Sequence, residues 1–90
     1  MDEKSQVTRL VVEELHRLST RPWVFVTGRL EGGVLRIGDR LAVAYGDQPP
    51  SEAVIRTIEM HTRPGTTTIA VDAELADHLG KGAVLTHVSG

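Results

Sequence analysis

The segment from Val26 to Val43, VTGRLEGGVLRIGDRLAV, constrains the fold most, because four glycines interrupt residues that favour β-strands. Glycines at such a spacing serve either a phosphate-binding loop or tight turns between strands. A phosphate-binding loop requires the pattern G-x-x-x-x-G-K-[ST] with a helix directly behind it, and neither this segment nor the later GKG tripeptide meets that requirement. We therefore predict a β-hairpin with a tight turn at Gly32-Gly33, a second corner at Gly38-Asp39, and no nucleotide binding by this chain alone.

Further segments have the β-branched, aromatic or alternating apolar residues that favour strands. They are separated by turn-forming stretches, of which the Pro49-Pro50 pair and the RPG tripeptide at 63–65 are the clearest. Strict alternation in the predicted strand over residues 53–61 would place the even-numbered residues from 54 to 60 on one face and the odd-numbered residues from 55 to 61 on the other. Together with the glycine-rich segment, the predicted strands cover residues 23–30, 40–45, 53–61, 66–71 and 83–88.

Two segments have helical features. Between the last two strands, DAELADHLGKG predicts one short helical turn near residues 73–79, with Asp72 as a side-chain cap and Gly80 in a left-handed C-terminal cap. The first segment, VTRLVVEELHRL, has apolar residues at helical spacing but also adjacent β-branched residues. From periodicity alone this segment favours a helix, and its surroundings favour a strand.

Six or seven short strands with turn residues between them predict an all-β fold, either a small closed barrel or a sandwich. Ninety residues are enough for one small domain. We expect a flexible N-terminus over residues 1–6 and a single β-barrel domain over residues 7–90. Closure into a barrel suits a chain of this length, because exposed sheet edges promote aggregation.

Composition excludes several classes of function. The formal net charge is −2, and Trp23, Phe25 and Tyr45 are the only aromatic residues, so strong intrinsic affinity for nucleic acid is not expected. The chain has no cysteine and its four histidines are dispersed, so we expect no metal site. No catalytic motif, signal peptide or membrane-spanning run is present, which predicts a cytoplasmic protein that is neither an enzyme nor bound to a cofactor.

In three blocks the sequence resembles the second domain of translational GTPases of the elongation factor Tu type. These are VTGRLEGGVLRIGDRLAV, then IRTIEMHTR, and finally LGKGAVL, in the family's order. The resemblance covers roughly Arg9 to His87 and implies a closed Greek-key-like β-barrel of six to seven strands. It also implies a strand rather than a helix over Leu10–Leu15.

In the family, this barrel carries out no chemistry and packs against the GTPase domain. In members that deliver tRNA it also holds the 3′ end of the tRNA. By resemblance, Glu59, His61 and Arg63 are the binding residues of this chain. Thr62 stands where the family usually has an arginine, and the loop after Arg63 is shorter than in the family.

The resemblance therefore implies a non-enzymatic binding module whose partner is the tRNA 3′ end or a translational GTPase. Two alternatives stay open. A protein-interaction adaptor unrelated to translation would use the same fold, and a homodimer would cover the barrel face that neighbouring domains cover in the family. Four arginines could form a basic face, but solvated arginines paired with acids such as Glu31 and Asp39 are the more common arrangement. These arginines are Arg29, Arg36, Arg40 and Arg56.

Overall fold

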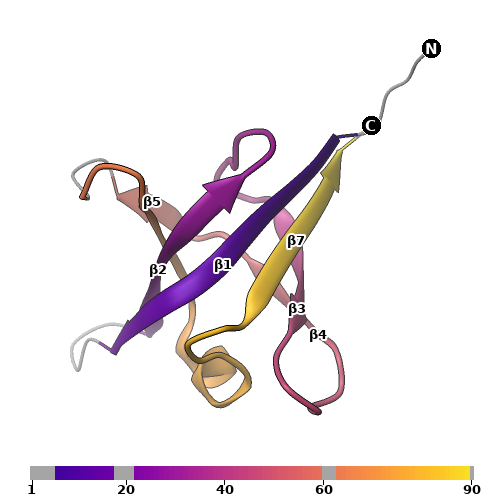
Figure 1. Cartoon of the computed structure of the whole chain (residues 1–90). Coiled ribbons are helices and arrows are strands. Elements are labelled where there is room, and N and C mark those ends of the chain that lie inside the picture. Colours follow the sequence, from indigo (N-terminus) through magenta and orange to yellow (C-terminus); the bar gives the residue numbers. More distant parts are fainter. Residues whose placement is uncertain (1–5, 18–21, 60–62, 90) are drawn as a thin grey trace.

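The computed structural model describes residues 6–17, 22–59 and 63–89 of the chain. It consists of seven antiparallel strands and one short 3-10 helix, arranged as a strongly curled sheet (Figure 1). The all-β prediction is therefore confirmed, including the number of strands. The elements are β1 (Gln6–Arg17), β2 (Trp23–Glu31), β3 (Arg40–Ala44), β4 (Ser51–Val54), β5 (Thr57–Glu59), β6 (Thr67–Asp72), η1 (Ala73–His78) and β7 (Val84–Ser89).

The segment with helical spacing is the long strand β1, as the family resemblance implied. It begins at Gln6, one residue before the predicted start of the domain, and residues 1–5 lie outside the described part of the chain. A β-bulge between Val12 and Glu14 shifts the alternation of side chains, so that Leu10, Val12 and then Leu15 face the core. The bulge explains the misleading spacing, because an extra residue in a strand breaks its period of two.

The two edges of the sheet are joined by the chain itself. The strand order is β4-β3-β7-β1-β2-β6-β5, so β4 and β5 lie at opposite edges, yet only Ile55 and Arg56 separate them in sequence. At this link the Ile55 amide donates to the Asp39 carbonyl (3.0 Å) and the Arg56 amide donates to the Ala70 carbonyl (2.8 Å). The sheet thus curls into a half-barrel whose open side is bridged by one bent segment.

This bend corrects the prediction of one regular strand over residues 53–61, of which residues 60 and 61 lie outside the described part of the chain. Ala53 and Ile55 are buried, and the next residue packed against the core is Ile58 rather than Thr57. The alternation therefore changes phase at Arg56. A single straight strand could not leave the ladder with β3 and join the ladder with β6, so the backbone breaks its period where it crosses between them.

The predicted hairpin between residues 26 and 43 is also wrong. β2 pairs with β1 and β6, whereas β3 pairs with β7 and β4, so the segment between them crosses one end of the barrel. Of the two turn glycines only Gly32 has a positive φ, 93°, and the Gly33 amide donates to the Thr8 hydroxyl (3.1 Å). The second corner is as predicted: Gly38 has a φ of 95°, and a carboxylate oxygen of Asp39 accepts the Arg36 amide proton (2.8 Å).

The core fills the inside of the curled sheet, and η1 covers one end of it. The helical turn lies where it was predicted, but its caps differ. Asp72 makes no side-chain capping bond, and the positive φ falls at Gly82 instead of Gly80. A Cβ at Gly80 would instead crowd the Tyr45 side chain, because it would lie 2.4 Å from the hydroxyl. The buried apolar cluster comprises Leu10, Val12, Val24, Val26, Leu41, Val43, Ala53, Ile55, Ile69, Val71, Ala76, Leu79, Ala83 and Leu85.

Candidate functional site

The outward face of β2 carries the side chains best suited to binding. Val24, Val26 and Gly28 point inward and are buried, so the alternate residues of the strand point outward. In chain order these outward side chains are two half-buried aromatic rings, a hydroxyl and a guanidinium, from Trp23, Phe25, Thr27 and Arg29. Such a sequence of groups offers stacking surface, hydrogen bonding and positive charge along one line.

Strand pairing extends this face into a row across four strands. Glu14 on β1 pairs with Thr27, Thr27 pairs with Thr68 on β6, and Thr68 pairs with Glu59 on β5. The two threonine hydroxyl oxygens lie 2.7 Å apart, which is the distance of a good hydrogen bond. One hydroxyl proton forms this bond and the other stays available for donation. We call Glu14, Thr27, Thr68 and Glu59 the threonine row.

A second row lies beside the first and contains an aromatic ring next to a buried alanine. It runs from His16 on β1 through Phe25 and Ala70 to Thr57 on β5. Ala70 points outward, because Ile69 and Val71 on either side belong to the core, yet it is fully buried. Its neighbours therefore cover it, and Phe25 and Thr57 flank it directly. The outer site, as we call the two rows together with Arg29, combines the half-buried Phe25 ring with carboxylates and hydroxyls.

An ion pair closes the outer site at the end of β6. The Arg56 guanidinium donates from Nε and Nη2 to the two carboxylate oxygens of Asp72, at 2.9 and 3.0 Å. The hydrogen bond from Arg56 holds the pKa of the Asp72 carboxyl below its ordinary value, and the same bond raises the pKa of the guanidinium. This contact explains why Asp72 does not cap η1, since a two-bond, charge-assisted contact is stronger than one capping bond.

The structure describes two of the three predicted binding residues. Glu59 is exposed and belongs to the threonine row. Arg63 is exposed in the turn before β6, where its carbonyl accepts bonds from the amide and the hydroxyl of Thr66. His61 lies outside the described residues. Sequence reasoning missed the contact between Thr27 and Thr68, because nothing local to either residue indicates that their strands pair.

The four arginines proposed as a basic face lie on different elements. Arg29 is on β2, Arg36 is in the loop before β3, Arg40 is on β3, and Arg56 links β4 to β5. Two of them are paired with acids: Arg56 binds Asp72, and Arg40 lies 3.4 Å from a carboxylate oxygen of Glu52. β2 and β3 are not neighbours in the sheet, so these arginines do not line one row.

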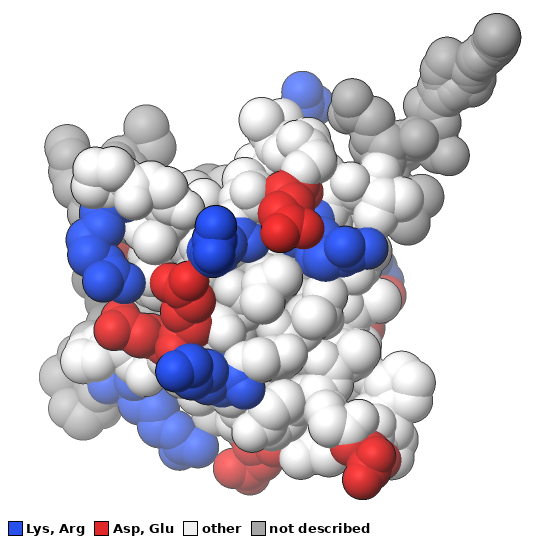
Figure 2. All heavy atoms as spheres, in the orientation of Figure 1, with Lys and Arg blue, Asp and Glu red and all other residues white. Residues whose placement is uncertain are grey.

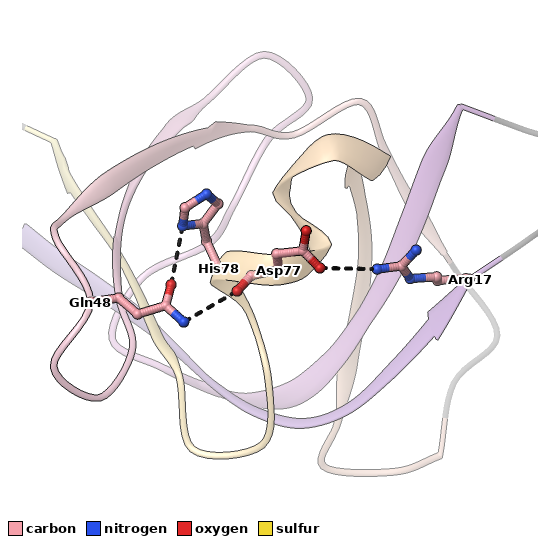
Figure 3. A network of polar contacts seen from close by, with 4 residues as sticks. All are labelled: Arg17, Gln48, Asp77 and His78. Atoms are coloured by element: carbon pink, nitrogen blue, oxygen red, sulfur yellow. Dashed lines mark hydrogen bonds and ion pairs between the residues drawn. The ribbon is translucent and has the colours of Figure 1, made fainter.

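A separate polar network lies at the end of the barrel covered by η1 (Figure 3). The ring nitrogen Nδ1 of His78 lies 3.1 Å from the Gln48 side-chain oxygen, and the Gln48 amide donates to the Asp77 carbonyl at 3.3 Å. Arg17 at the end of β1 reaches the Asp77 carboxylate at 3.5 Å. The network ties the β3–β4 loop and β1 to η1. Its ion pair is strongly exposed, so its contribution to stability is small.

Other kinds of site find no support in the described part of the chain. Within it, no three histidine, aspartate or glutamate side chains lie close enough together to hold a metal ion. None of its helices has the length and apolar character needed to cross a membrane. No protein-family model matches the sequence, and no curated protein matches it significantly.

Proposed function

We propose that the protein is a non-enzymatic binding module that holds the end of an unpaired RNA strand on its outer site. The observation that carries the proposal is the order of outward groups along β2, beside the threonine row. Proteins recognise unpaired RNA by stacking its bases on aromatic rings and by hydrogen bonding to its ribose hydroxyls. Phe25 supplies a ring, the threonine row supplies acceptors and a hydroxyl donor, and Arg29 supplies a phosphate contact.

The charge of the outer site favours the end of an RNA strand over a long stretch of RNA. Glu14 and Glu59 lie at the two ends of the threonine row, and the net charge of the chain is −2. Carboxylates repel phosphates but accept hydrogen bonds from ribose hydroxyls. A 3′-terminal ribose offers two hydroxyls and no further phosphate. The resemblance to the elongation factor Tu barrel agrees with this proposal, because Glu59 is one of the residues that it implies for the tRNA 3′ end.

Fluorescence polarisation with a labelled single-stranded RNA of about ten nucleotides tests the proposal. We expect RNA to bind more tightly than DNA of the same sequence, and periodate cleavage of the terminal ribose to weaken binding. Glu59→Gln should weaken RNA binding about tenfold, since hydrogen bonds to a charged acceptor contribute about 1.5–3 kcal/mol. Glu74→Gln is the matched control, because Glu74 is exposed on η1 and belongs to neither row of the outer site.

Two outcomes would overturn the proposal. One is equal binding of RNA, DNA and periodate-treated RNA, which would leave only a charge-driven association. The other is no binding of RNA at low salt, where electrostatic attraction is least screened. The second outcome would favour the alternative of a protein-interaction adaptor. Glu59→Gln and Glu74→Gln should unfold at similar temperatures, which separates a lost contact from a damaged fold.

A further inference from the structure

Among the side chains that form the outer site, His16 is the one whose charge changes near neutral pH. It is exposed on β1, and its partner in the β1–β2 ladder is Phe25. Paired side chains on adjacent antiparallel strands lie on the same face, with their Cβ atoms about 5 Å apart. The imidazole therefore lies beside the ring that would stack with an RNA base.

The charges of the outer site are few, so one added charge changes their balance. Glu14 and Glu59 are exposed carboxylates, and Arg29 is an exposed cation. While His16 is neutral, two carboxylates and one guanidinium give the outer site a net charge of −1. Figure 2 shows acidic and basic described residues interspersed on the side of the molecule that it presents, without a broad basic area. A proton on His16 therefore brings the net charge of the outer site to zero.

The elements packed around His16 contribute one charged group to its face. This group is Glu14, two residues earlier on β1. Arg17 lies on the opposite face, where it reaches the Asp77 carboxylate of η1 at 3.5 Å. On β2 the segment from Trp23 to Thr27 is uncharged, and β7 pairs only with the first half of β1. Since histidine is the side chain that changes charge between about pH 5 and pH 8, the charge on this face follows His16.

The other histidines have different positions. His78 belongs to the polar network at η1. The ring nitrogen Nδ1 of His87 lies 3.0 Å from the Arg40 carbonyl oxygen, at the start of β3. His61 lies outside the described residues. Within the described part of the chain, a pH response that arises in the outer site is therefore assigned to His16.

We propose that protonation of His16 strengthens RNA binding at the outer site, so that RNA binds at mildly acidic pH and is released as the pH rises. This regulation rests on the proposed function, because it acts on RNA that the outer site holds. The phosphates of a nucleotide whose base stacks on Phe25 lie within about one Debye length of the imidazole, which is about 10 Å at 0.1 M salt. The added charge is therefore only partly screened and reduces the repulsion of these phosphates.

Fluorescence polarisation with the labelled RNA at about pH 8 and about pH 5.5 tests the proposal, read for each variant as the ratio of the two dissociation constants. The wild type should bind about threefold more tightly at the lower pH, within the range of an exposed ion pair. His16→Gln should show equal binding at both pH values, because glutamine does not titrate. His16→Lys should also show equal binding, because lysine is charged at both. His78→Gln is the matched control and should keep the wild-type ratio.

The possible failures are distinguishable. If RNA binds at neither pH, the proposed function and its regulation both fail. If RNA binds but the wild type shows no pH dependence, or His16→Gln keeps the wild-type ratio, the regulation by His16 is overturned and the proposed function stands. The wild-type ratio should shrink as salt is raised, since His16 is exposed, and a ratio that salt does not change would also overturn the regulation. Circular dichroism of each variant at both pH values checks that the fold is retained.

Discussion

At Gly28 the backbone of β1 occupies the space that a side chain on β2 would need, so replacing Gly28 with alanine is a stringent test of the fold. A Cβ at this position would lie 2.1 Å from the Val11 carbonyl oxygen and 3.1 Å from the Val12 Cα. Both contacts are with backbone, so no flexible side chain can turn away. Gly28 has no positive φ, which means that the contact alone, and not a strained backbone, decides the effect of Gly28→Ala.

The expected cost follows from how far the strands must separate. Ordinary contact with a Cβ begins at 3.4 Å, so β1 and β2 must move apart by about 1.3 Å. β1 cannot move freely, because Val12 also exchanges two 2.9 Å hydrogen bonds with Gly82 and Ala83 on its other side. Overpacking costs about 1–3 kcal/mol, and a weakened ladder bond adds about 1 kcal/mol. We expect Gly28→Ala to lower the free energy of unfolding by about 3 kcal/mol.

Thermal unfolding followed by circular dichroism measures this loss. For a domain of this size about 3 kcal/mol corresponds to a fall in Tm of roughly 12–24 °C. Gly46→Ala is the matched control: Gly46 has a φ of 55° and nothing within 4 Å of a built Cβ. It should cost only about 1 kcal/mol for the left-handed backbone. If Gly28→Ala proves no more destabilising than Gly46→Ala, the close approach of β1 and β2 described above is wrong.

Two further predictions concern the link between β4 and β5. Ile55→Ala should lower the free energy of unfolding by about 2–5 kcal/mol, because Ile55 is 1% exposed, whereas Ile37→Ala, at a side chain that is 65% exposed, should have little effect; equal effects in urea denaturation would contradict this. The pH dependence follows from the lowered pKa of Asp72 in the folded state. Its contribution to stability is present above the unfolded carboxyl pKa of about 3.9 and is lost as the pH falls through the folded value. Asp72→Asn should therefore have a lower free energy of unfolding than the wild type at neutral pH, and this difference should disappear in acid. A difference that is the same at both pH values would contradict the assignment.

Local sequence patterns predicted the elements well, and non-local pairing explains where they failed. β-branched and aromatic residues located β2, β3, β6 and β7, and the short helical turn fell at its predicted place. The hairpin prediction was wrong because adjacency in sequence suggested adjacency in the sheet, whereas β7 and β1 lie between β3 and β2. The Asp72 cap was wrong for a similar reason, since its real partner, Arg56, is sixteen residues away.

The candidate site was also predicted only in part, for the same reason. Glu59 was predicted as a binding residue from the family resemblance, and the structure places it at the end of a row whose other members were not predicted. Thr27 and Thr68 are forty-one residues apart, and each is an ordinary strand residue when taken alone. Their contact needs the register of the β2–β6 ladder, which no local pattern specifies.

The bend at Ile55 and Arg56 connects the fold to the site. The bend lets the chain leave the β3 ladder and join β6, and this second ladder brings Glu59 beside Thr68. Arg56 then fixes the bend from outside through Asp72, while Ile55 fixes it from inside through the core. The same two residues thus bridge the open side of the half-barrel and position the last carboxylate of the threonine row. Because β5 is only three residues long, it has little else to hold it against β6. The position of Glu59 therefore depends on this link more than on β5 itself.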